Sequence, residues 1–174
     1  HVQISKLIKQ GGGVAGTAIV TLARLGARTS IVWCVGDDDD GRFVISDLAK
    51  EGVDVGHIAV VPGLTTPSAH VLVDEVTGKR TIAFYYDASI LTHLANTDMD
   101  WIRGFSALYI DGAHDASIRA ARVAKESKVL VVCGTAEYAP DYGKILELVD
   151  VFIASIDWAR SLTGESEPVG AARR

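Results

Sequence analysis

The chain is poor in the residues that build disulfide frameworks, metal centres and membrane anchors. Its 174 residues include two cysteines, and Cys34 and Cys133 each lie inside an apolar run, which predicts buried small hydrophobic side chains. Such cysteines are typical of a reducing compartment, so we expect a cytoplasmic protein. The five histidines have neither metal-ligand nor catalytic-triad spacing. No secretory signal is visible, and the uncharged run Gly11–Ala23 is too short to span a bilayer.

The chain also lacks an excess of positive charge. It carries 17 Lys and Arg against 22 Asp and Glu, a net charge of −5. Nucleic acids and anionic membranes select basic surfaces, so neither is expected as a partner. Hydrophobic residues make up 48% of the chain, which is enough for one globular domain with a sizeable core.

Helical and strand patterns alternate along most of the chain. Residues 15–25 are almost all apolar or small and end at Gly26, which predicts a buried helix. The β-branched run 28–36 predicts a buried parallel strand, and residues 40–52 have helical spacing. The same rhythm predicts helices over 98–105, 115–127, 140–149 and 157–164, and strands over 107–111, 128–132 and 150–155. Four buried strands with interposed helices predict an α/β fold with a doubly wound, mainly parallel sheet.

Residues 68–86 follow a different pattern. Apolar residues alternate with polar ones on both sides of a Thr-Gly turn, which predicts an antiparallel hairpin. Inside an α/β chain, such a hairpin is an insertion. It is either a lid over a ligand or an ordinary extension of the sheet edge.

The glycine cluster near the start of the chain allows more than one interpretation. Gly11, Gly13 and Gly16 spell the G-x-G-x-x-G pattern of dinucleotide-binding folds, and Asp37 follows about 20 residues later. However, "ISKLIKQ" precedes the glycines, where that motif needs a buried apolar strand. An NAD-dependent Rossmann oxidoreductase therefore remains an alternative on weak grounds, as does a plain turn before a helix.

Three longer segments together resemble one family. "GGVAGTAIVTLARLG", "VGDDDDG" and "LAKEGVDV" resemble the ribokinase-like (PfkB) carbohydrate kinases, and "TTPSAHVLVDEVTGKRTIAFY" resembles their lid. The resemblance implies a partial ribokinase-like α/β domain over residues 1–174, with a β-hairpin lid insertion at about 57–88. It also implies transfer of the γ-phosphoryl group of ATP, assisted by Mg²⁺, to a sugar-like alcohol. A homodimer through the lid is a further implication.

The same resemblance assigns substrate-binding residues. Gly12 and Gly13 correspond to the family's substrate-binding glycine pair, where the absence of Cβ atoms lets polyol hydroxyls approach the main chain. Thr17 stands where the family usually has asparagine, on the helix that follows. Ala69 matches a lid position whose backbone contacts the sugar. Asp111 ends a strand at a place where the family has a substrate-binding acid.

The segment around residues 155–158, which the resemblance assigns to nucleotide binding, matches the family less well. Ser155 stands where the family's Asn-x-x-Glu motif begins and is assigned to the cofactor ATP, whereas Trp158 stands in place of the glutamate. Asp157 could substitute for that acid by proximity. The acidic run 37–40 predicts a solvated turn that caps a helix rather than a metal site. His114 is expected in a surface loop.

The sequence assigns no catalytic residue. The family's Gly-Ala-Gly-Asp segment, whose aspartate is the base, has no match, and both ends of the chain look cut. We therefore expect part of a longer sugar kinase. A non-catalytic sugar-binding remnant of the same fold is the alternative.

Overall fold

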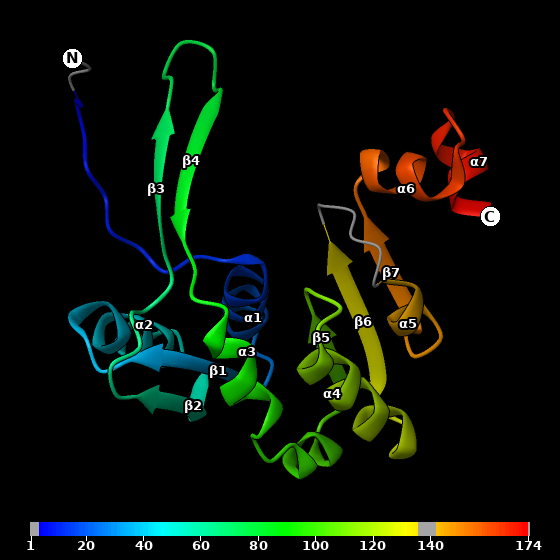
Figure 1. Ribbon diagram of the computed structural model, residues 1–174, viewed down its shortest axis with the longest axis horizontal. Coiled ribbons are helices and arrows are strands. Elements are labelled where there is room, and N and C mark those ends of the chain that lie inside the picture. The colour runs from blue at the N-terminus through cyan, green and yellow to red at the C-terminus, as the bar shows by residue number, and fades with distance from the viewer. Residues whose placement is uncertain (1–3, 136–141, 174) are drawn as a thin grey trace. The chain divides into compact units, whose positions relative to one another are not determined.

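The computed structural model describes residues 4–135 and 142–173, which belong to two compact units. The first unit ends at Leu94 and the second begins at Ala95. Each unit contains helices and its own parallel sheet (Figure 1).

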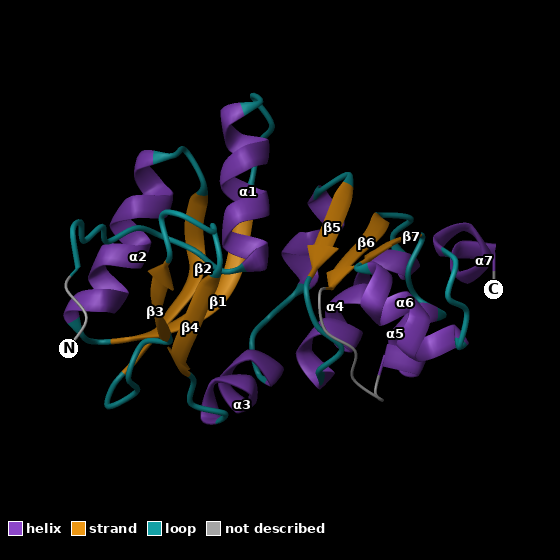
Figure 2. Ribbon diagram, turned by 90° about the horizontal axis from the view of Figure 1, so that it is seen from above, coloured by secondary structure: helices purple, strands orange, loops and turns teal. Residues whose placement is uncertain are grey.

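The first unit contains a two-stranded parallel sheet, a hairpin and three helices. Its elements are α1 (Val14–Arg24), β1 (Ser30–Gly36), α2 (Asp39–Lys50), β2 (Asp54–Val61), β3 (Ser68–Val73), β4 (Arg80–Tyr85) and α3 (Ser89–Ala95). α1 ends before Gly26, whose φ of 88° is accessible to glycine, as the sequence predicts, but no residue of α1 is buried, so the prediction of a buried helix is wrong on that point. α1 and α2 both pack against the sheet (Figure 2).

β1 pairs with β2 in parallel, with Trp33 opposite Ile58 and Cys34 opposite Ala59. The helix α2 makes the crossover between the two strands, as parallel neighbours require. β2 was not predicted, because polar residues and a glycine interrupt its apolar pattern. Since residues 57–61 lie in this sheet, the antiparallel insertion begins later than residue 57.

β3 and β4 form the predicted antiparallel hairpin, in register from Ser68 opposite Tyr85 to Val73 opposite Arg80. Asp74 closes the turn by accepting hydrogen bonds from the amides of Val76, at 2.8 Å, and Thr77, at 2.9 Å. Every residue of both strands is exposed. Figure 1 shows the hairpin standing out from the β1–β2 sheet.

The second unit is a three-stranded parallel sheet with helices. Its elements are η1 (Asp100–Gly104), β5 (Ala107–Ile110), α4 (Asp115–Glu126), β6 (Leu130–Thr135), α5 (Gly143–Leu146), β7 (Val151–Ala154), α6 (Ile156–Thr163) and α7 (Pro168–Arg173). The strand order is β5–β6–β7, and α4 packs on β5 and β6.

Parallel strands joined through helices occur in both units, as the sequence predicts. Within residues 4–135 and 142–173, β1 is hydrogen-bonded to β2, whereas β5, β6 and β7 bond to one another. The α/β class and the parallel pairing are confirmed.

Two further predictions concern the core and the membrane. Cys34 and Cys133 are buried free thiols, and burial raises the pKa of both, that of Cys133 to about 11. They are therefore protonated hydrophobic side chains, as predicted. Across the described ranges, no helix is both long enough and apolar enough to cross a bilayer.

Candidate functional site

The glycine segment before α1 leaves open space above its backbone. A Cβ atom added at Gly12 or Gly13 would meet no atom of the described residues within 4 Å. Gly13 has a φ of 79°, a conformation that favours glycine, and it is the N-cap of α1. Because glycine has no side chain with which to cap a helix, ligand oxygens can accept from the amides of the first turn.

α2 holds this segment from the other side. The Gly11 amide donates to Asp47 Oδ2 at 3.1 Å, and a Cβ at Gly11 would lie 2.8 Å from that oxygen. Two residues earlier, Lys9 forms an ion pair with Asp40 at 2.5 Å and lies 4.7 Å from the centre of the Phe43 ring. The glycines are therefore open on one side and anchored on the other.

The structure brings Gly12, Gly13 and Thr17 together at the amino end of α1. Thr17 is exposed one turn into the helix, and its amide donates to the Gly13 carbonyl at 3.0 Å. Ala69 is exposed on β3 opposite Phe84. The sequence analysis assigned Gly12, Gly13, Thr17 and Ala69 to substrate binding. All four are exposed, so a substrate could reach them.

The four aspartates of the run 37–40 bind residues of the segment 62–67, of the first turn of α2 and of the N-terminal segment. Asp37 accepts from the Gly63 amide at 3.3 Å, Asp38 from Thr66 and Gly41, Asp39 pairs with Arg42, and Asp40 pairs with Lys9. Asp38 is the N-cap of α2, so the predicted helix cap is confirmed. Hydrogen bonds from Thr66 and the Gly41 amide lower the pKa of Asp38 to about 2, so this side chain is not merely solvated.

In the second unit, Asp111 follows β5 directly and is exposed at the carboxyl end of that strand. Ligands of parallel sheets bind at such ends. Near it, His114 caps α4, since its Nδ1 accepts from the Ser117 amide at 3.3 Å. Burial lowers the pKa of His114. His114 therefore holds the start of a helix, in place of the surface-loop role that the sequence suggests.

Ser155 is the N-cap of α6, and its hydroxyl accepts from the Trp158 amide at 3.1 Å. Trp158 is 3% exposed and packs against Phe152, with ring centres 4.6 Å apart, and against Tyr142, at 5.7 Å. Hydrophobic packing therefore surrounds the residue that the resemblance places at the family's glutamate position.

The acidic residue nearest to Trp158 along α6 is Asp157. Asp157 is exposed and lies 3.6 Å from Arg160. In the part of the chain that the structure describes, no three His, Cys, Asp or Glu side chains converge where they could hold a metal ion.

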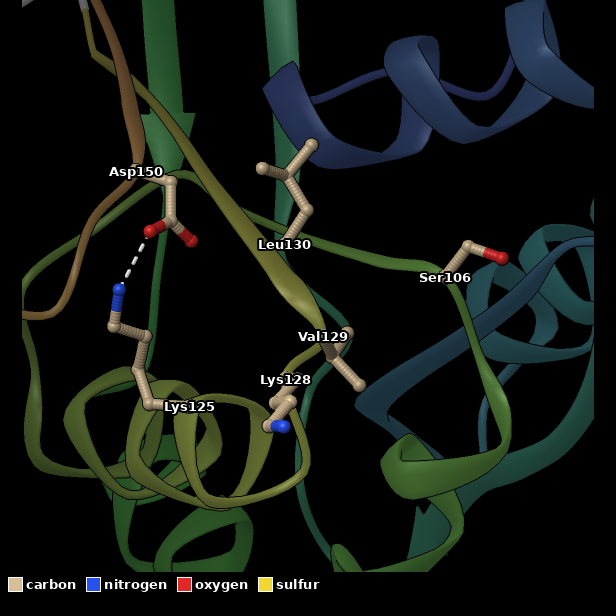
Figure 3. A pocket seen from close by; sticks show the side chains of 6 residues that line it. All are labelled: Ser106, Lys125, Lys128, Val129, Leu130 and Asp150. Atoms are coloured by element: carbon tan, nitrogen blue, oxygen red, sulfur yellow. Dashed lines mark hydrogen bonds and ion pairs between the residues drawn. The ribbon is translucent and has the colours of Figure 1, made fainter.

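A hollow of about 390 Å³ lies in the second unit at the amino end of β6 (Figure 3). Its lining residues are Ser106, Lys125, Lys128, Val129, Leu130 and Asp150. Asp150 accepts from Lys125 at 2.5 Å and from the Val131 amide at 2.8 Å, so its carboxylate fastens α4 to the sheet. The hollow lies at the opposite end of the strands from Asp111 and is not part of the candidate site.

Comparisons with known proteins show the family and the fold of the chain. The sequence model of the pfkB family carbohydrate kinases matches residues 1–173. Fructokinase-1 of Oryza sativa is 31% identical over 134 residues, which is 71% of this chain and 41% of that protein. Aminoimidazole riboside kinase of Salmonella typhimurium is 28% identical, over 69% of this chain and 40% of that protein.

A solved structure shows the same fold. The Escherichia coli protein described as ribokinase II, in complex with ATP and Mg²⁺, superposes with a TM-score of 0.77 at 24% identity. The superposition covers 99% of this chain and 63% of that one. The chain spans about two fifths of the length of the two relatives. Its sequence and its ribokinase-like α/β fold place it in the pfkB family of carbohydrate kinases.

Proposed function

We propose that this chain supplies the acceptor site of a kinase that transfers the γ-phosphoryl group of ATP to a hydroxyl of a sugar or sugar-like alcohol. The observation that carries the proposal is the glycine segment, open above Gly12 and Gly13 and anchored through Gly11 to Asp47. The names of its relatives, a fructokinase and a riboside kinase, support an acceptor that contains a sugar ring.

In this proposal the acceptor lies on the backbone of Gly12 and Gly13, with Thr17 contributing a hydroxyl that both donates and accepts. The hairpin β3–β4 is the lid, and Ala69 meets the substrate through its main chain. Closure would exclude water, which protects the phosphoryl donor from hydrolysis. Asp111 is proposed as a further contact of the substrate, and Ser155 as a contact of the nucleotide.

Bound ATP with Mg²⁺ would supply the transferable phosphoryl group and neutralise its charge. The residues of this chain bind and orient the acceptor hydroxyl, which is most of what phosphoryl transfer asks of a protein. The base that accepts the hydroxyl proton is not assigned to any of them.

Three broader features belong to the same proposal. Residues 1–174 form part of one ribokinase-like domain whose lid comprises β3 and β4. The protein works in the cytoplasm on small molecules rather than on nucleic acids or membranes. The exposed apolar residues of the lid, among them Phe84 and Ile82, favour a homodimer through that surface.

A binding experiment tests the acceptor site. Thermal shift is measured with a ketohexose, a pentose, a ribonucleoside, ATP with Mg²⁺, and NAD, on the wild type and on Gly12→Val. The variant fills the open space and should lose the shift caused by the sugar while remaining folded. Gly104→Val is the matched control, because a Cβ there also meets no described atom within 4 Å.

The outcomes separate the candidate functions. A sugar-dependent shift that Gly12→Val abolishes, with ADP formation by the natural protein, supports the kinase. A shift with sugar but no ADP formation indicates a sugar-binding protein of the same fold. Stabilisation by NAD alone would overturn both in favour of an oxidoreductase.

A further inference from the structure

The segment that leads from β2 into the hairpin, residues 62–67, is fastened through one buried threonine. Thr66 is 2% exposed. Its hydroxyl accepts from the Gly36 amide at 2.9 Å and donates to Asp38 Oδ1 at 2.6 Å, while its own amide donates to Asp38 Oδ2 at 2.9 Å. One residue therefore ties the root of the hairpin both to the end of β1 and to the N-cap of α2.

The backbones at this root are in direct contact. A Cβ at Gly36 would lie 2.0 Å from the Leu64 carbonyl oxygen, and a Cβ at Gly41 would lie 2.2 Å from the Gly36 carbonyl oxygen. Both positions therefore require glycine for the close approach. The Asp38 carboxylate closes the arrangement by also accepting from the Gly41 amide at 2.8 Å.

Beyond the root, the hairpin turn is contacted by the N-terminal segment, where the Ser5 hydroxyl donates to Glu75 at 3.0 Å. All residues of β3 and β4 are exposed, and a two-stranded hairpin is marginally stable by itself. The hydrogen bonds where residues 62–67 meet Asp38 therefore help to fix the direction in which the hairpin leaves the unit.

The same helix also anchors the glycine segment. α2 contacts Gly11 through Asp47 and Lys9 through Asp40, while its N-cap contacts Thr66. The helix α2 and its N-cap therefore contact both the root of the hairpin and the glycine segment.

We propose that Asp38 and Thr66 form a latch that holds the β3–β4 hairpin in the position from which it covers the acceptor alcohol. The two are positioning residues, since neither is assigned to the substrate. The covering of the acceptor rests on the proposed function, whereas the latch rests on the hydrogen bonds alone.

A distance measurement tests the latch without reference to activity. Spin labels are attached at Val76→Cys, in the hairpin turn, and at Lys50→Cys, at the end of α2; both positions are exposed, whereas the natural Cys34 and Cys133 are buried. Thr66→Val keeps the shape of the side chain but removes the hydroxyl, and should broaden the distance distribution by pulsed EPR. Thr66→Ser should restore the wild-type distribution.

Thr65→Val is the matched control, because the neighbouring Thr65 is exposed. Asp38→Asn is the second variant, in case Thr66→Val does not fold. Asparagine has the same shape as aspartate, but its amide NH₂ group cannot accept a hydrogen bond from Thr66 as the second carboxylate oxygen does. Asp38→Asn should therefore also broaden the distance distribution. If Thr66→Val and Asp38→Asn, or whichever of the two folds, have a distance distribution as narrow as that of Thr65→Val, the latch is refuted.

Kinetics then test the consequence for the acceptor. Thr66→Val should raise KM for the sugar about tenfold, because the variant loses both hydrogen bonds of the buried hydroxyl, with a smaller change in kcat. If Thr66→Val has a broadened distance distribution but the same KM for the sugar as Thr65→Val, the positioning role is overturned. A broadened distribution with no turnover even in the wild type would refute the proposed function and leave the latch standing.

Discussion

The root of the hairpin is buried and hydrogen-bonded, whereas its two strands are exposed to solvent. At the root, Thr66 is buried, Asp38 accepts three hydrogen bonds, and two glycines allow backbones to touch. In the strands every residue is exposed, and Val76 in the turn is 95% exposed. The difference shows that this insertion takes its order from where it is attached rather than from a core of its own.

The largest effect is expected at the root. Gly36→Ala places a Cβ against the Leu64 carbonyl and should lower the free energy of unfolding by about 3 kcal/mol, measured by urea denaturation. Gly16→Ala is the control, since a Cβ there meets no described atom within 4 Å. Because Gly16 lies inside α1, its replacement should stabilise by about 0.5–1 kcal/mol. Equal midpoints for the two variants would contradict a close-packed root.

A second test uses pH. Hydrogen bonds lower the pKa of Asp38 from its ordinary value of 3.8 to about 2 in the folded protein. Its contribution to stability is therefore complete above pH 4 and is lost as the pH falls from about 4 to about 2. When the free energy of unfolding is measured from pH 5 down to pH 2, it should fall more steeply for the wild type than for Asp38→Asn. Parallel curves would mean that the root does not depend on the ionised carboxylate.

A smaller effect is expected at the turn. Asp74→Ala removes an acceptor from the Val76 and Thr77 amides and should cost about 1 kcal/mol locally. Hydrogen exchange should quicken at these two amides but not at Thr66. Val76→Ala is the control, because its side chain is almost wholly exposed. Faster exchange at Thr66 as well would show that turn and root open together.

The smallest effect on stability is expected in the strands. Phe84 is 75% exposed, so Phe84→Ser should change the free energy of unfolding by less than about 0.5 kcal/mol. If the lid forms the proposed homodimer, sedimentation should show a shift to monomer. Leu7→Ser, at an exposed residue of the N-terminal segment, should leave the oligomeric state unchanged. A dimer that survives Phe84→Ser would place the interface elsewhere.

The strongly periodic elements could be predicted from the sequence. Val14–Arg24 and Ser30–Gly36 carry unbroken apolar patterns, and Arg80–Tyr85 alternates. β2 was missed because Gly56 and His57 interrupt its pattern, and half of it is exposed. α3 was missed because seven residues are too few for a helical period to show.

Local contacts of the site were predictable, but distant ones were not. The cap made by Asp38 follows from its spacing of three residues to Gly41. Its bonds to Thr66 join residues 28 positions apart, which no local pattern reveals. In the same way, the resemblance predicted that Trp158 replaces a glutamate, whereas its packing against Phe152 and Tyr142 depends on how β7, α5 and α6 meet.

The four consecutive aspartates carry a consequence for sequence variation in this region. Each carboxylate serves a different partner, so the order of the acids matters more than their summed charge. Inserting or deleting one residue would rotate every later side chain by about 100° around α2 and detach several partners at once. Relatives should therefore tolerate substitutions among residues 37–40 far better than a change in the length of the run.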